Sequence, residues 1–128
     1  MTWSDAEKIC NDKYGGHLAA VKSSKIQQHL KPLITGQKRS KRIGACYVIF
    51  PRIFPSLSDA DVWTGAEWVS DGVWRWASDK TELLYTDWLT GQPSADANKK
   101  CIEMWWPDWK WGNEECLRNS KFVCQWLP

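Results

Sequence analysis

Residues 91–116 hold most of the side chains in this sequence that could bind a ligand, in the stretch GQPSADANKKCIEMWWPDWKWGNEEC. Its amides, hydroxyls and carboxylates could form hydrogen bonds with a polar ligand, and its indole rings could stack on a planar group or a sugar. The candidate carbohydrate-binding residues are Gln92, Ser94, Asp96, Asn98, Trp105, Trp106, Trp109, Asn113 and Glu114. An N-acetyl group suits this set, because its flat amide both stacks and forms hydrogen bonds.

The same residues also have a structural interpretation. The strand-like alternation in CIEMWW should turn one of Trp105 and Trp106 inward, so we expect about half of the tryptophan cluster to be packing. Glu114 and Glu115 could equally form an exposed acidic turn.

The five cysteines favour disulfides over a metal centre. They include no C-x-x-C pair, and His17 and His29 lie far from them without H-x-x-x-H spacing, so a zinc site is not expected. Widely spaced cysteines in a small, Trp-rich domain are typical of a disulfide framework and hence of a secreted, extracellular protein. One cysteine is left over, and it is either free and buried or available to bridge two chains.

Composition excludes several function classes. A length of 128 residues with 43% hydrophobic residues predicts one domain, residues 1–128, with a core of its own. A net charge of +2 without a basic pattern does not indicate a nucleic-acid partner, and no apolar run approaches the roughly 18 residues of a membrane span. We do not expect an enzyme, because the chain has no G-x-S-x-G motif and no recognisable catalytic carboxylate pair.

Two helices are predicted ahead of the strands. A capping box, Ser4-Asp5-Ala6-Glu7, should start the first helix, which should stop at Gly15-Gly16. A second box at residues 24–27 should open a helix that Pro32 kinks or ends. The expected inward residues are Trp3, Ala6, Ile9, Cys10 and Tyr14 in the first helix and Ile26, Leu30, Leu33 and Ile34 in the second.

The rest of the chain is strand-like. HLAAV is expected to be a short extended segment, and DVWTG, VWRWA, CIEMW and KFVCQ are predicted strands separated by polar turns. Residues 35–61 show no sustained helical period, and they include ACYVIF, a candidate strand inside a long connection. Helices followed by strands predict an α+β fold.

Several of these motifs together resemble the C-type lectin-like domain. The segments TWSDAEKICNDKYGGHLAAV, VWTGAEW, GVWRWASD, TDWLTGQPS and WGNEECLRNSKFVCQ occur in that family's order and near its spacing. The resemblance implies two helices that flank antiparallel sheets, a long ligand-binding loop, and disulfides joining Cys10 to Cys124 and Cys101 to Cys116. It also places Trp111 in the core and leaves Cys46 as the odd cysteine.

Residues 35–61 depart from the family pattern as an atypical insert. The family usually starts with a Cys-Tyr strand ahead of its first helix, and we expect that strand to be absent here. The segment Cys46–Phe50 could supply a replacement at the sheet edge, where an unpaired strand is a liability; an irregular loop is the alternative. We expect Cys46 to be exposed there and able to form a disulfide-linked dimer, or else to be free and buried.

Sugar-binding members of this family hold a calcium ion that the sugar hydroxyls ligate. The resemblance places the five ligand positions at Gln92, Ser94, Lys99, Gly112 and Asn113. Calcium needs about six to eight oxygen ligands, carboxylates among them. None of these five residues is a carboxylate, and Lys99 adds a positive charge, so we expect no metal in this principal site. A register shift to Asn113 and Glu114 would restore one carboxylate, and the acidic C-terminal half leaves calcium at a non-principal site open.

Two binding functions follow from the resemblance. The first is a calcium-independent lectin that recognises glycans, with N-acetylhexosamine termini as the favoured ligands. The alternative is a lectin-like domain that binds a protein or mineral surface and no sugar. The Gln92-Pro93 pair and the polar side chains that follow it favour the sugar.

Overall fold

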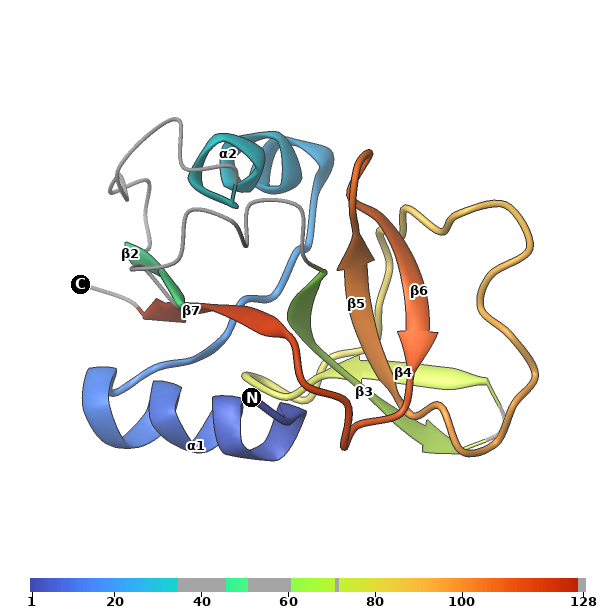
Figure 1. Cartoon of the computed structure of the whole chain (residues 1–128), viewed down its shortest axis with the longest axis horizontal. Coiled ribbons are helices and arrows are strands. Elements are labelled where there is room, and N and C mark those ends of the chain that lie inside the picture. The colour runs from blue at the N-terminus through green and yellow to red at the C-terminus, as the bar shows by residue number, and fades with distance from the viewer. Residues whose placement is uncertain (35–45, 51–60, 71, 127–128) are drawn as a thin grey trace.

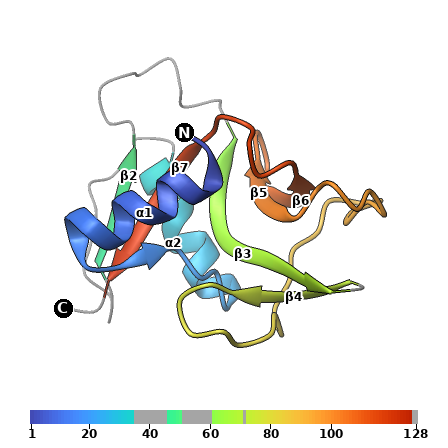
Figure 2. The same cartoon turned by 90° about the horizontal axis from the view of Figure 1, so that it is seen from below.

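The computed structural model describes residues 1–34, 46–50, 61–70 and 72–126. These residues form two helices and seven strands, and the strands form one mixed sheet of order β1-β7-β3-β5-β6, with β2 also paired to β7 and β4 to β3 (Figure 1). The elements are α1 Trp3–Tyr14, β1 His17–Leu18, α2 Ser24–Ile34, β2 Cys46–Phe50, β3 Val62–Ser70, β4 Val73–Trp76, β5 Cys101–Trp105, β6 Lys110–Glu114 and β7 Lys121–Trp126. The α+β prediction is confirmed, and α1 and α2 lie on opposite sides of β7 (Figures 1 and 2). The expected antiparallel sheets are instead one mixed sheet, because β3 and β7 pair in parallel and join the strands on either side of them.

Helix α1 begins earlier than its sequence predicts. Its N-cap is Thr2, whose hydroxyl accepts a hydrogen bond from the Asp5 N–H, so the capping box at Ser4 is wrong by two residues. The reason is tertiary: the indole of Trp3 donates to the carbonyl of Thr64 at 2.8 Å and fixes Trp3 at the helix start. The predicted stop is confirmed, because Gly15 caps the helix at a φ of 62°, which glycine adopts without strain.

Helix α2 is capped by Ser23, whose hydroxyl accepts from the Ile26 N–H at 3.2 Å. It runs to Ile34, so Pro32 does not end it. Leu30 and Ile34 are buried as predicted, whereas the side chain of Leu33 lies outside the described part.

Two strands extend the predicted set. Strand β2 pairs antiparallel with β7, from Cys46 opposite Trp126 to Phe50 opposite Phe122, so the backbone of the insert does supply a strand to this sheet. The side chain of Cys46 is outside the described residues, and its exposure stays a prediction. Strand β6 was not predicted; its residues form a strand because they pair with β5 along its whole length.

The core has two parts, a larger and a smaller cluster of buried residues. Trp111 is fully buried in the larger part, where the rings of Trp76, Tyr85 and Trp88 meet it edge-on at 5.7 to 6.0 Å, which confirms its predicted core position. The smaller part packs α1 on the sheet around the Cys10–Cys124 disulfide. The second bridge, Cys101–Cys116, ties the start of β5 to the segment after β6, so both disulfide pairings are confirmed.

Candidate functional site

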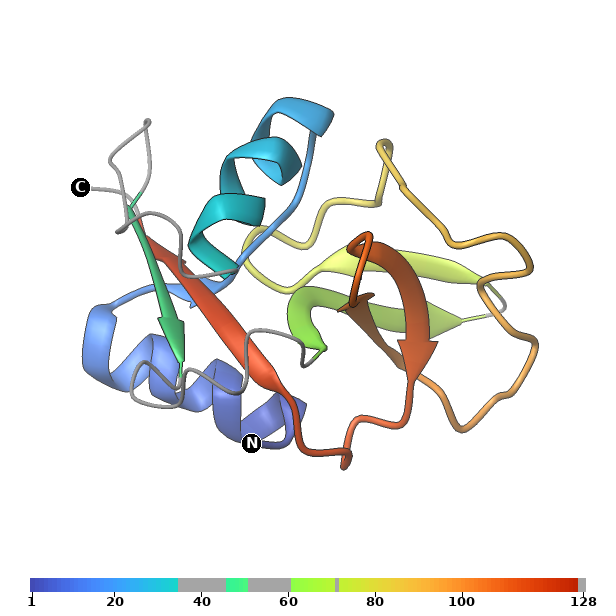
Figure 3. The ribbon, with the colours of Figure 1, turned by 45° about the horizontal axis from the view of Figure 1, so that its top comes forward.

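The chain between β4 and β5 runs alongside the β5–β6 hairpin and carries most of the predicted ligand residues (Figure 3). The backbone N–H of Trp111 donates to the carbonyl of Asp87 at 2.8 Å, and the N–H of Leu89 donates to the carbonyl of Trp111 at 2.9 Å. These two bonds attach the segment before the Gln92-Pro93 turn to β6. The turn is thereby held next to the end of β6, where Asn113 lies.

Asn113 joins the two halves of the candidate site. Its carboxamide is 1% exposed. The Oδ1 atom accepts from the N–H of Ser94 at 2.7 Å, while Nδ2 donates to the carbonyls of Ser94 at 3.1 Å and Lys99 at 3.0 Å. One buried side chain therefore cross-links the Gln-Pro-Ser turn to the residues just ahead of β5.

Gly112 has no room for a ligand side chain. A Cβ placed at this glycine would lie 2.2 Å from the nearest ring carbon of Trp105, because the indole covers the backbone there. The ring is held by a hydrogen bond from its Nε1 to the Glu103 carboxylate at 3.3 Å. The position that the resemblance gives to a calcium-ligating asparagine is thus covered by a tryptophan.

The residues at the principal calcium positions do not fit the ion. The Oδ1 of Asn113 already accepts a hydrogen bond, Gly112 supplies no side-chain oxygen, and Lys99 supplies a cation. Only the amide oxygen of Gln92 and the hydroxyl of Ser94 remain as side-chain donors, and two neutral oxygens fall far short of the six to eight that calcium takes. Among the described residues, no group of three or more His, Cys, Asp or Glu could hold a metal.

The oxygens of Gln92 and Ser94 have unmet hydrogen-bonding capacity. Both residues are half-buried, and Gln92 Oε1 and Ser94 Oγ are enclosed with no hydrogen-bond partner within the described ranges. An enclosed acceptor without a donor costs free energy, about 1 to 3 kcal/mol in proteins. Donors from a bound molecule could satisfy these two atoms after a small rotation of either side chain.

The residues that follow Ser94 form the exposed part of the loop. The carboxylate of Asp96 accepts a hydrogen bond from the N–H of Asn98 at 2.9 Å. Its backbone carbonyl accepts one from the N–H of Lys99 at 3.1 Å. Asp96 and Asn98 are both exposed, so their outer polar atoms can meet a ligand. The structure therefore brings Asn113 next to residues 92–98, which carry most of the other polar side chains of the predicted site and are called the polar loop below.

The structure divides the tryptophans of the predicted site. Trp109 is 3% exposed and belongs to the larger core, so it cannot stack on a ligand. Trp106 is 52% exposed at the tip of the β5–β6 hairpin. Since Asn113 pairs with Ile102, Trp106 lies four residues along the hairpin from Asn113, roughly 14 Å at strand spacing. Trp106 is therefore remote from the polar loop, and Trp105 covers Gly112 between them.

Glu114 belongs to an ion-pair cluster that sequence reasoning missed. The guanidinium of Arg118 lies 3.1 Å from the carboxylate of Asp61 and 3.5 Å from those of Glu103 and Glu114. Burial raises the pKa of the fully enclosed Glu103 carboxyl, against the hydrogen bond from Ser120 and the charge of Arg118. Burial also raises the pKa of Asp61. Glu114 is half-buried, and its charge is already engaged.

Gln27 of α2 is a second residue that the sequence analysis missed. Its side chain is 2% exposed. Its Oε1 accepts from the Trp111 indole at 3.0 Å, and its Nε2 donates to the carboxylate of Asp87 at 2.5 Å and to the carbonyl of Trp109 at 3.3 Å. The signal was its place on the apolar face of α2, three residues before Leu30 and seven before Ile34.

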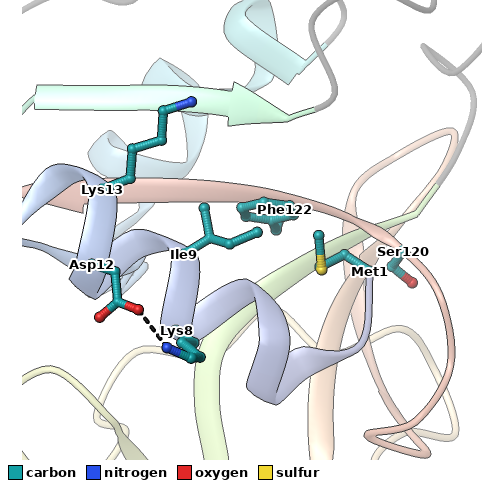
Figure 4. Close-up of a pocket in the computed structure, with 7 residues that line it drawn as sticks. All are labelled: Met1, Lys8, Ile9, Asp12, Lys13, Ser120 and Phe122. Carbon is teal, nitrogen blue, oxygen red and sulfur yellow. Dashed lines mark hydrogen bonds and ion pairs between the residues drawn. The ribbon is translucent and has the colours of Figure 1, made fainter.

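A separate pocket of about 510 Å³ lies against α1 and β7 (Figure 4). Apolar atoms form most of its lining, which comes from Met1, Lys8, Ile9, Asp12, Lys13, Ser120 and Phe122. None of the predicted site residues lines this pocket. In Figure 1, α1 lies at the opposite end of the molecule from the loop that carries residues 92–100. The pocket is therefore distinct from the polar loop.

No helix among the described residues is long and apolar enough to cross a membrane.

The fold and the site define a disulfide-stapled α+β binding domain with a long loop cross-linked to a β-hairpin. Residues 1–126 match the family model described as the lectin C-type domain, so the chain belongs to the C-type lectin family. It is 30% identical over 129 residues to a C-type lectin of Cerberus rynchops, covering 98% of this chain and 70% of that protein. It is 27% identical over 128 residues to lithostathine-1 of Mus musculus, covering 98% and 66%.

Solved structures show the same fold. Human lithostathine superposes with a TM-score of 0.78 at 21% identity and covers 100% of this chain and 78% of its own. A calcium-independent type II antifreeze protein superposes with a TM-score of 0.72 at 26% identity and covers 99% and 79%. The predicted C-type lectin-like fold is confirmed.

Proposed function

We propose that this domain is a secreted lectin that binds glycans without calcium in the principal site, with N-acetylhexosamine termini as preferred ligands. The observation that carries the proposal is the Asn113 cross-link. In the calcium-binding pattern an ion gathers the Gln-Pro-Ser turn and the segment ahead of β5, whereas here one carboxamide joins them by accepting one hydrogen bond and donating two. The loop can therefore keep its shape without a metal.

The ligand surface of this proposal is smaller than the sequence indicates. Gln92, Ser94, Asp96 and Asn98 supply the contacts, and Asn113 positions them from below. The unmet acceptors on Gln92 and Ser94 suit the N–H of an acetamido group and the sugar hydroxyls. Two intramolecular disulfides support secretion, since such bonds persist in oxidising compartments. We propose no catalytic role, since the sequence carries no recognisable catalytic motif.

Calorimetric titration of N-acetylglucosamine and N-acetylgalactosamine tests the proposal. Binding should have the same affinity in excess chelator and in millimolar calcium. Gln92→Ala and Ser94→Ala should each weaken it severalfold, and Gln28→Ala on the exposed side of α2 should not. Binding that chelator abolishes and calcium restores would refute the calcium-independent site and favour ligation through Asn113 and Glu114.

A second candidate function is supported by two solved relatives. One is the calcium-independent type II antifreeze protein, and the other is ovocleidin-17, which is named as a major protein of the eggshell calcified layer. A lectin-like domain that binds a mineral or protein surface and no sugar fits these neighbours. The absence of any saccharide binding, with or without calcium, would favour this alternative.

A further inference from the structure

Two adjacent lysines in the candidate site stand out by their lack of ion pairs. Most other cations of the sheet region lie beside a carboxylate: Arg75 and Lys80 beside Glu67, Lys110 beside Asp87, and Arg118 within its cluster of three. Within the described ranges, neither Lys99 nor Lys100 has an ion-pair partner. Their positive charge is therefore available to a ligand.

The backbone of both lysines is fixed to the site. The N–H of Lys99 donates to the carbonyl of Asp96 at 3.1 Å, and its carbonyl accepts from Asn113 at 3.0 Å. The carbonyl of Lys100 accepts from the N–H of Trp68 at 2.9 Å. The two side chains therefore start from anchored positions, one beside the Gln-Pro-Ser turn and the next beside β3.

Trp68 positions the second ammonium group. The Nζ of Lys100 lies 5.2 Å from the centroid of the half-buried Trp68 ring, within cation–π range. The contact restrains a side chain that would otherwise sample many rotamers, which lowers the entropic cost of binding an anion. The indole of Trp68 is also nearer to this loop along the sheet than that of Trp106, because Trp68 pairs with the residue ahead of β5.

The acidic groups near these lysines are partly engaged elsewhere. The carboxylate of Asp96 accepts a hydrogen bond within its own turn, and Glu114 lies beside Arg118. Lys99 stands where the calcium-binding pattern has a carboxylate, so the charge at that position is inverted. In the calcium-binding pattern a metal ion binds neutral sugar hydroxyls. Here the ammonium group of a lysine can instead bind an anionic group directly.

We infer that the ligand is an acidic saccharide, whose carboxylate or sulfate ester contacts the ammonium groups of Lys99 and Lys100. The inference rests on the proposed glycan-binding function and names its substrate class. Exposed ion pairs each change affinity by about two- to fivefold, so the two lysines together should contribute roughly four- to twenty-five-fold. Salt should weaken this contribution, because screening acts on exposed charges.

Chemical-shift titrations in excess chelator test the inference with three probes: N-acetylglucosamine, its 6-sulfate, and N-acetylneuraminic acid. At about 20 mM salt, at least one acidic probe should bind roughly four- to twenty-five-fold more tightly than the neutral sugar, and most of this preference should disappear near 300 mM. Comparison of the sulfate with the carboxylate identifies the anionic group. Lys99→Gln and Lys100→Gln should each remove about two- to fivefold, and the matched control Lys25→Gln, an exposed lysine of α2, should leave affinity unchanged.

The outcomes separate the inference from the function on which it rests. Equal affinities for neutral and acidic probes, unaltered by either lysine variant, would overturn the inference while leaving glycan binding intact. A preference that survives both variants would overturn the assignment to Lys99 and Lys100. Binding of no saccharide at either salt concentration would refute the proposed function, and the inference would fall with it.

Discussion

At the residue scale, Asn113 controls the shape of the ligand loop. Its carboxamide makes three hydrogen bonds to backbone groups of Ser94 and Lys99 while almost completely enclosed. A carboxylate in its place could accept from the Ser94 N–H, but it could not donate to the two carbonyls. At this position a carboxylate would suit a metal ion, whereas only a carboxamide can make all three hydrogen bonds to the loop. One side chain therefore cannot serve both purposes.

We predict that Asn113→Ala lowers the free energy of unfolding by about 2 to 3 kcal/mol, because it strands one enclosed N–H and two carbonyls. Asn113→Asp should also be destabilising, since it loses both donated bonds. Urea denaturation measures the stability, and amide exchange at residues 92–100 should become faster. The exposed Asn119→Ala is the control, and an Asn113→Ala variant as stable as that control would show that the cross-link is dispensable.

Residue types and the family resemblance indicated which residues the candidate site contains, but not the roles of those residues within it. The sequence predicted that Gln92, Ser94 and Asn113 lie near one another, because the family resemblance aligns both turns, and in the structure Asn113 bonds to Ser94. It did not show that Asn113 is buried or that Trp105 covers Gly112. Both depend on which face of β6 each residue occupies, and β6 is defined by its pairing with β5 rather than by its own pattern.

At the element scale, α2 and β6 are joined through a polar contact inside the core. Gln27 satisfies the Trp111 indole and bonds to Asp87 and to the carbonyl of Trp109, so one helix residue holds both β6 and the start of the ligand loop. Such an enclosed network is stable only when every member has a partner. Removing its centre should affect the sheet and the loop together.

Gln27→Leu should therefore cost about 2 to 3 kcal/mol of stability, since it fills similar space but leaves the Trp111 N–H and the Asp87 carboxylate without this partner. Gln28→Leu changes the neighbouring exposed residue in the same way and should alter stability by less than about 0.5 kcal/mol. Thermal and urea unfolding of the two variants provide the comparison. Similar stabilities for both would mean that the network adds nothing to packing.

The elements were easier to predict than their ends. The apolar period of α1 and the alternation of VWRWA were sufficient, because both signals come from burial of one face. The start of α1 was misplaced because the side chain of Trp3 bonds to Thr64, a contact 61 residues away that no local pattern encodes. The strand at Cys46–Phe50 was left open for a similar reason, since its partner is at the far end of the chain.

At the scale of the whole molecule, a cluster of one guanidinium and three carboxylates joins several strands of the sheet. Glu103 of β5, Asp61 ahead of β3 and Glu114 at the end of β6 converge on Arg118, which precedes β7. The cluster thus links β5 and β6 to the segments that lead into β3 and β7. Its cost lies in Glu103, which is 0% exposed: burial disfavours the ionised carboxylate, and the hydrogen bond from Ser120 and the charge of Arg118 compensate only in part, so the pKa is raised.

The raised pKa of Glu103 predicts how the stability of the molecule varies with pH. Its folded-state pKa lies above the ordinary value of 4.5, so between that value and the folded pKa the folded protein binds more protons than the unfolded chain. Stability from this group is fully present below 4.5 and is lost as pH rises through the folded pKa. Asp61, whose pKa burial also raises above 3.8, acts in the same direction.

We therefore predict that Glu103→Gln flattens the decline in stability between pH 4.5 and pH 7.5. The amide can still accept from Trp105 and can donate to the hydroxyl of Ser120, and Arg118 is 47% exposed and keeps Asp61 and Glu114 as partners, so no buried charge is left alone. At pH 7.5 the variant should therefore equal wild type or exceed it by about 1 kcal/mol, because it no longer carries an enclosed carboxylate. Urea denaturation across this pH range gives the two curves, with the exposed Glu82→Gln as the matched control. A steeper decline in Glu103→Gln than in wild type would mean that the Arg118 ion pair outweighs the burial of the carboxylate, contrary to the direction of the pKa shift.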